Sequence, residues 1–137
     1  MFREIIRLAV VLPLVTLIAL PSHAGRHDPI LSPEPIGVPD GKSAEEIRKS
    51  VRKALFDDEW ETREIAPGRL QAKRSKRGKD EVHTATIEVA YTGGSVRISY
   101  KDSQNLNYDA KDKTIHSTYN RWIRNLERRI RKNLGAY

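Results

Sequence analysis

Two runs of alternating apolar and polar residues, 82–91 and 95–101, constrain the fold of this chain more than any other part of its sequence. Successive side chains of a strand point to opposite faces, so each run predicts a strand with one buried and one solvated face. Gly93 and Gly94 separate the runs and predict a tight hairpin turn. The apolar positions are Ala85, Ile87, Val89, Tyr91, Val96, Ile98 and Tyr100. Such a sheet needs a second layer that covers its apolar face.

Two amphipathic helices, one before and one after the strands, are predicted to supply that layer. Ser43 to Glu46 has the S-x-x-E form of a capping box, and apolar residues recur at helical spacing from there to about residue 57. A second helix is predicted from about Thr114 to Leu134, because its apolar residues fall on an arc of about 120° at 3.6 residues per turn. These residues are Ile115, Tyr119, Trp122, Ile123, Leu126, Ile130 and Leu134.

Two shorter strand patterns complete the predicted domain. Residues 60–65 and 69–73 flank a turn formed by Ala66, Pro67 and Gly68. Short turns between successive strands favour an antiparallel meander. We therefore predict one α+β domain over residues 43–137 in the order α-β-β-β-β-α. Its four-stranded antiparallel meander is covered on one face by the N-terminal and the C-terminal helix.

The N-terminus has the features of an export signal. Arg3 and Arg7 precede a short apolar run, residues 8–20, and small residues stand before a cleavage site after Ala24. The run is too short to span a bilayer comfortably, so residues 1–24 are predicted to be a cleavable signal peptide. The mature protein is then expected in the periplasm, with no transmembrane helix after cleavage.

The segment between the signal and the domain, residues 25–42, contains Pro29, Pro33, Pro35 and Pro39 and shows little apolar periodicity. Proline-rich segments of this kind adopt extended conformations and lack the pattern of a packed core. Residues 25–42 are therefore predicted to be an extended linker.

Composition limits the chemistry that the chain can perform. There is no cysteine, which excludes disulfides, thiol catalysis and lipid attachment at a lipobox. The formal net charge is +7. For an exported protein this charge favours anionic lipid, lipopolysaccharide, a cell-wall polymer or another envelope protein as partner.

The cations concentrate in the loop between the second and third predicted strands and on the outer face of the last helix. These predicted contact residues are Lys73, Arg74, Lys76, Arg77, Lys79, Arg121, Arg124 and Arg128. No aromatic residue is interleaved with the loop cations, so binding of nucleic acid is not expected. The alternative interpretation is a solvated hairpin tip, since short charged runs are usually solvent-exposed.

A polar and aromatic cluster is predicted where the last strand leads into the last helix, at Ser103, Asn105, Tyr108, His116, Tyr119 and Asn120. His116 and Asn120 are four residues apart and share a helix face. The favoured interpretation is a hydrogen-bonded lock between loop and helix, because buried hydroxyl and amide groups need partners.

The alternative is a hydrolytic or small-ligand site around His116, with Ser103 as the nucleophile. No nucleophile-elbow glycine pattern surrounds Ser103, which favours a binding module over an enzyme. The histidines have no clear metal-ligand spacing, and no glycine-rich phosphate loop is present. The sequence therefore predicts neither a metal nor a cofactor.

One segment of the sequence resembles a family signature. It consists of Tyr100-x-x-Ser103-x-Asn105-Leu106-x-Tyr108, then Ile115-His116-x-x-Tyr119-Asn120-x-Trp122-Ile123-x-Asn125-Leu126. It is similar to the C-terminal part of a family of small, uncharacterised exported or lipoprotein-type proteins of Gram-negative bacteria. The resemblance implies an envelope location and the same topology, but no activity. We expect a non-catalytic binding or scaffolding module for anionic envelope components, with a protein–protein assembly partner as a further alternative.

Overall fold

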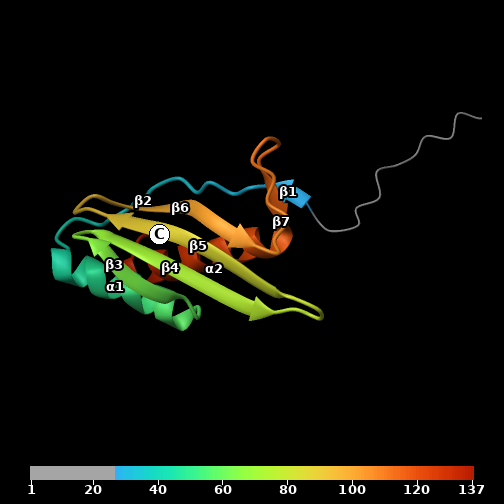
Figure 1. Ribbon diagram of the computed structural model, residues 1–137. Coiled ribbons are helices and arrows are strands. Elements are labelled where there is room, and N and C mark those ends of the chain that lie inside the picture. Colours follow the sequence, from blue (N-terminus) through green and yellow to red (C-terminus); the bar gives the residue numbers. More distant parts are fainter. Residues whose placement is uncertain (1–26) are drawn as a thin grey trace, which may run out of the picture.

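The computed structural model describes residues 27–137, in which two helices cover one face of an antiparallel sheet (Figure 1). The predicted α+β class is therefore confirmed. The predicted signal peptide lies outside the described residues. The helices are α1 (Ala44–Asp57) and α2 (Ser117–Leu134), and the strands are β1 (His27–Pro29), β2 (Ile36–Gly37), β3 (Glu61–Ala66), β4 (Arg69–Arg77), β5 (Val82–Tyr91), β6 (Ser95–Gln104) and β7 (Thr114–His116).

The main sheet has five strands in the order β2-β6-β5-β4-β3, and β1 and β7 form a second, two-stranded sheet. The prediction of a four-stranded sheet was wrong because it lacked β1, β2 and β7. These strands have only two or three residues each, which is too short for an alternating pattern to show. The predicted meander corresponds to β3, β4, β5 and β6, which pair antiparallel in chain order.

Residues 27–39, which we call the strap, lie against the domain and do not act as a free linker. Ile36 is buried and pairs with Val96 of β6, and the Val38 N–H donates to the Gly94 carbonyl at 2.9 Å. In this register the N–H groups of even-numbered strap residues face β6. Pro33, Pro35 and Pro39 are odd-numbered, so their nitrogen atoms face away from β6 and no hydrogen bond between the strap and β6 is lost. Because proline has no N–H group, the outer edge of the strap also offers fewer hydrogen-bond donors to another chain. The same prolines made the segment resemble a linker.

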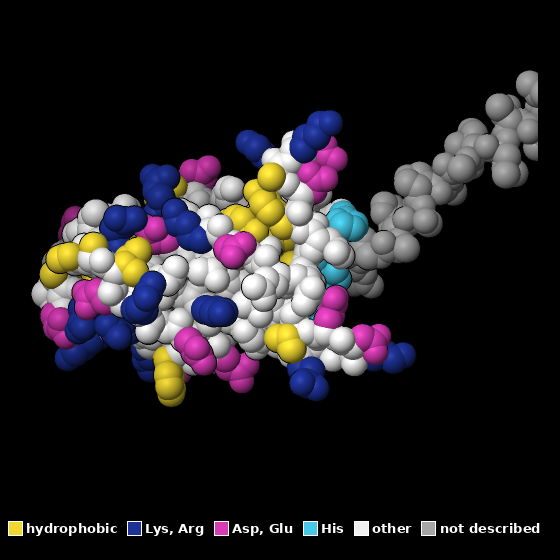
Figure 2. Space-filling view, viewed as in Figure 1, with side chains coloured by type: hydrophobic (Ala, Val, Ile, Leu, Met, Phe, Trp, Pro, Cys, Tyr) yellow, Lys and Arg dark blue, Asp and Glu magenta, His cyan; other side chains and the backbone are white. Residues whose placement is uncertain are grey.

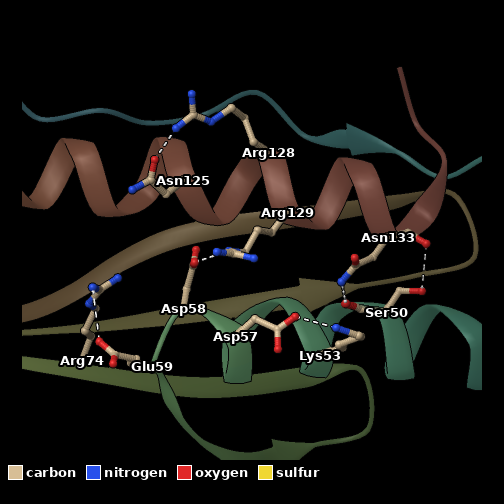
Figure 3. Close-up of polar contacts among 10 residues, drawn as sticks. All are labelled: Ser50, Lys53, Asp57, Asp58, Glu59, Arg74, Asn125, Arg128, Arg129 and Asn133. Carbon is tan, nitrogen blue, oxygen red and sulfur yellow. Dashed lines mark hydrogen bonds and ion pairs between the residues drawn. The ribbon is translucent and has the colours of Figure 1, made fainter.

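The apolar arcs of both helices meet the apolar face of the sheet, and Ile87 and Leu126 are each 0% exposed. Of the predicted apolar sheet positions, Tyr91 and Tyr100 are only partly buried. The α2 helix begins at Ser117, because residues 114–116 pair with β1 as a strand. Polar contacts join the two helices (Figure 3). The Asn133 side-chain amide donates to the Ser50 carbonyl at 3.0 Å, and Arg129 pairs with buried Asp58. Within residues 27–137, neither helix has the length and apolar character needed to cross a membrane.

Candidate binding groove and basic surfaces

A groove of about 370 Å³ lies at the edge of β6 opposite β5, where in the described part of the chain no strand pairs with the residues after Val96. The short β2 strand pairs only with Ser95 and Val96. Beyond that point the strap leaves β6, and the groove lies between them. Its lining includes Leu31, Pro33, Arg97, Ile98, Tyr108 and Lys113. Apolar side chains gather on this part of the surface, beside the loop that precedes β7 (Figure 2).

Tyr100 is the centre of the polar and aromatic cluster. Its ring packs 4.4 Å from that of Tyr108 and meets the ring of Tyr119 edge-on at 5.6 Å, measured between centroids. Its hydroxyl and the Ser103 hydroxyl are 2.8 Å apart. Burial raises the pKa of both Tyr100 and Tyr119, so both phenols stay protonated at neutral pH. Three predicted residues therefore converge on Tyr100, a residue that the cluster prediction did not include.

Asn120 holds the strap, whereas the sequence suggested that it holds the loop after β6. The Leu31 N–H donates to Asn120 Oδ1 at 2.9 Å, and Asn120 Nδ2 donates to the Pro29 carbonyl at 2.9 Å. The side chain is 2% exposed, so both contacts lie away from solvent. An amide side chain offers one acceptor and two donors, which lets it bond the strap backbone much as a neighbouring strand would.

His116 caps the N-terminus of α2. Its Nδ1 atom accepts from the Thr118 N–H at 3.1 Å, so the ring form that caps is the neutral one with its proton on Nε2. Its backbone N–H donates to the carbonyl of fully buried Leu106 at 2.8 Å. His116 therefore links the loop after β6 to the helix, and its ring stacks on that of His83 with centroids 5.9 Å apart.

Asn105 ties the same loop to β5. Its side-chain amide donates to the Val82 carbonyl at 2.9 Å, and its own carbonyl lies 2.6 Å from His83 Nδ1. Its φ of 58° is left-handed, a conformation that asparagine tolerates better than most residues. The nucleophile and base of the hydrolytic hypothesis, Ser103 and His116, thus have other partners, and neither lines the groove. Residues 27–137 hold no group of three or more metal-ligating side chains suited to a metal ion.

We expect the change His116→Ala to lower the free energy of unfolding by about 1 kcal/mol, because the Thr118 N–H loses its cap. The changes His116→Asn and His116→Ser should cost only a few tenths of a kcal/mol, since both side chains can cap a helix. Urea unfolding measures all three. If the serine variant were as destabilised as the alanine variant, capping would not be the role of this side chain.

The predicted basic loop is split between the two faces of the sheet. Arg74 points toward the helices, with its guanidinium 4.9 Å from the centre of the Trp122 ring and 3.7 Å from the Glu59 carboxylate (Figure 3). Its side chain is only 14% exposed, so it belongs to the core boundary. The other loop cations are exposed on the β4–β5 hairpin, which extends past the neighbouring strands (Figure 1). These four residues, which we call the basic hairpin, are Lys73, Lys76, Arg77 and Lys79.

The second predicted basic surface lies on the helix layer. Arg121, Arg124 and Arg128 are exposed on α2, and Arg128 donates to the side chain of Asn125 (Figure 3). The open face of the sheet mixes both signs of charge (Figure 2). There Arg69, followed by Lys101, lowers the pKa of the Glu88 carboxyl through hydrogen bonds at 2.7 and 3.3 Å. The cations that form no ion pair within residues 27–137 therefore include the four of the basic hairpin and Arg121, Arg124 and Arg128 of α2.

The chain was compared with protein-family models, with curated proteins and with solved structures. None of these comparisons finds a match. The resemblance to small exported proteins therefore stays a prediction.

Proposed function

We propose that this protein is an exported, non-catalytic binding module of the bacterial periplasm that attaches to anionic envelope components. The observation that carries this proposal is the basic hairpin. Its four cations are exposed, and none of them takes part in an ion pair with another residue of the described chain. Cations that have no carboxylate partner can neutralise phosphate or carboxylate groups on a surface. Each contributes about 1 kcal/mol near an anionic membrane.

Neutralising the basic hairpin tests this function. A variant with Lys73, Lys76, Arg77 and Lys79 all changed to glutamine should bind vesicles that contain phosphatidylglycerol, and lipopolysaccharide, at least about 30-fold more weakly. Co-sedimentation with the vesicles measures the loss. All four side chains are exposed, so the fold should be retained, which circular dichroism can verify.

A matched variant separates the hairpin from the effect of net charge. Changing Lys42, Lys49, Arg52 and Lys111 to glutamine removes the same charge from places outside the basic hairpin and α2. We expect this variant to bind nearly as well as the wild type, because attraction by exposed charges decays within a Debye length of about 8–10 Å. Equal loss in both variants would show that net charge alone acts, and full binding by the hairpin variant would refute the proposal.

A second candidate function, as an assembly partner for another envelope protein, is favoured by one apolar feature. Phe56 at the end of α1 is 79% exposed, and it lines a shallow cavity of about 570 Å³ together with Trp60. Contiguous apolar patches at the surface often mark protein contacts, and Phe56 would anchor such a contact at this cavity. The change Phe56→Ser would weaken such an assembly without changing vesicle binding.

A further inference from the structure

The unpaired part of β6 presents backbone hydrogen-bonding groups to the groove. Ile36 pairs with Val96, and Val38 donates to Gly94, so even-numbered residues of β6 direct their N–H and C=O groups toward the strap edge. Ile98 and Tyr100 continue this alternation. In the described chain, strap residues 30–35 form no backbone hydrogen bond with either of them. Two N–H groups and two carbonyls are therefore available at the groove.

The strap is held by other partners. The Ile30 N–H donates to the Lys113 carbonyl at 2.9 Å, and the Leu31 N–H donates to Asn120. Both contacts direct this part of the strap toward α2 and the loop before β7, and away from β6. The strap therefore forms one wall of the groove while the edge of β6 remains unpaired.

The shape and charge of the groove indicate what could occupy it. The strap runs alongside the same edge, so it hinders pairing with the broad sheet edge of a second copy (Figure 1). The groove between the strap and β6 is the space that a single extended segment would occupy. Leu31, Pro33 and Tyr108 supply apolar contacts. Arg97 and Lys113 also line the groove, and neither is in an ion pair with any residue between 27 and 137. The lining thus suits a strand that carries both apolar and acidic side chains.

We propose that the unpaired edge of β6 binds an extended polypeptide segment with alternating apolar and acidic residues, which adds to the sheet as an antiparallel strand. The segment would span about five residues, or about 16 Å, at the strand rise of about 3.3 Å per residue. Its acidic side chains would face Arg97 and Lys113. This inference is independent of the basic hairpin, which lies elsewhere on the molecule.

The register assigns a role to each residue of the bound segment. In an antiparallel pair, residues that exchange both hydrogen bonds project their side chains to the same face. The segment's residues opposite Ile98 and Tyr100 must therefore point toward the helix layer, as the side chains of Ile98 and Tyr100 do, and direct their own N–H groups at β6. The acidic residues between them direct their N–H groups away from the protein.

Backbone methylation of a peptide tests this arrangement. The probe is a fluorescent, capped peptide of about eight residues in which valine and glutamate alternate. Methylating the valine amides should weaken binding by about tenfold or more, because the N–H groups that face β6 are lost. Methylating the glutamate amides should leave affinity within about twofold. Fluorescence anisotropy measures affinity, and the amide resonances of Ile98 and Tyr100 should shift on binding.

Two matched charge variants test the role of the lining cations. Arg97→Glu should weaken binding of the unmethylated peptide by about fivefold or more, whereas Arg63→Glu, at an exposed position of β3, should not. The basic-hairpin variant should bind the peptide like the wild type, which separates this site from the proposed function. The proposal is overturned if the peptide does not bind or if both methylated peptides bind with the same affinity. It is also overturned if the Ile98 and Tyr100 resonances shift with protein concentration, through self-association, and not with added peptide.

Discussion

Replacing Trp122 by alanine is expected to lower the free energy of unfolding by about 3–5 kcal/mol, the usual cost of removing a large buried aromatic ring. Trp122 is 2% exposed and contacts the loop before β3 and the strand β4. The Trp60 ring meets it edge-on with centroids 6.2 Å apart, and the Arg74 guanidinium lies over its face. Its loss would leave a cavity and would also remove the aromatic contact of a largely buried cation. Urea unfolding followed by circular dichroism measures the change.

The variant Trp122→Phe separates the cavity from the contact with Arg74. Phenylalanine keeps an aromatic face for the guanidinium, so this variant should retain part of the lost stability. A double-mutant cycle of Trp122→Leu with Arg74→Met should give a coupling energy of about 0.5–2 kcal/mol. A coupling of zero would mean that Arg74 gains nothing from the ring. In that case its low exposure would have to arise from packing of its aliphatic part alone.

The second large effect is expected at Asn120, where the change to alanine should cost about 2–3 kcal/mol. The variant would leave the Leu31 N–H and the Pro29 carbonyl without their partner, and an unsatisfied buried polar group typically costs 1–3 kcal/mol. Asn120→Asp should be destabilising as well, because a carboxylate keeps the acceptor but loses the donor to Pro29. Hydrogen exchange should then show faster exchange of the Leu31 amide.

Asn125 provides a control on the same helix. Its side chain forms a hydrogen bond with exposed Arg128 and with no other described residue, so Asn125→Ala should change stability by no more than about 0.5 kcal/mol. If the Leu31 amide were still protected from hydrogen exchange in Asn120→Ala, the pairing of β1 with β7 and of β2 with β6 would be enough to hold the strap. Because the strap forms one wall of the groove, loosening it should also weaken binding of the valine–glutamate peptide.

The parts of the fold that the sequence predicted well are those with long repeating patterns. Ala85, Ile87 and Val89 alternate along β5, and each is fully buried. The Ser43 hydroxyl accepts from the Glu46 N–H at 3.1 Å, as the capping-box pattern predicted. The strap had no such signal. Its contacts with the domain are backbone hydrogen bonds, the two hydrogen bonds of the Asn120 side chain, and a few apolar side chains whose spacing shows no sustained period. Ile36 is buried, and Ile30, Leu31 and Val38 pack against the core.

The candidate site was only partly predictable for the same reason. Ser103, Tyr108 and Tyr119 do lie together, but around Tyr100, which the pattern had assigned to the apolar face of a strand. Arg74 looked like one member of a continuous basic loop. Its even position in β4 turns it toward the helices, where it meets Trp122. The sequence could predict which face of the sheet each residue of β4 points to. It could not predict how far the helices extend along β4.

By itself, the sequence determined the α+β class, both helices and the central hairpin, because the periods of 2 and 3.6 residues are local properties of the chain. The tertiary structure alone decided that Asn120 would bind a segment some ninety residues earlier. It also decided that half of the β6 edge would remain unpaired. Both depend on where distant backbone groups meet, and every residue type except proline carries the same backbone N–H and C=O groups.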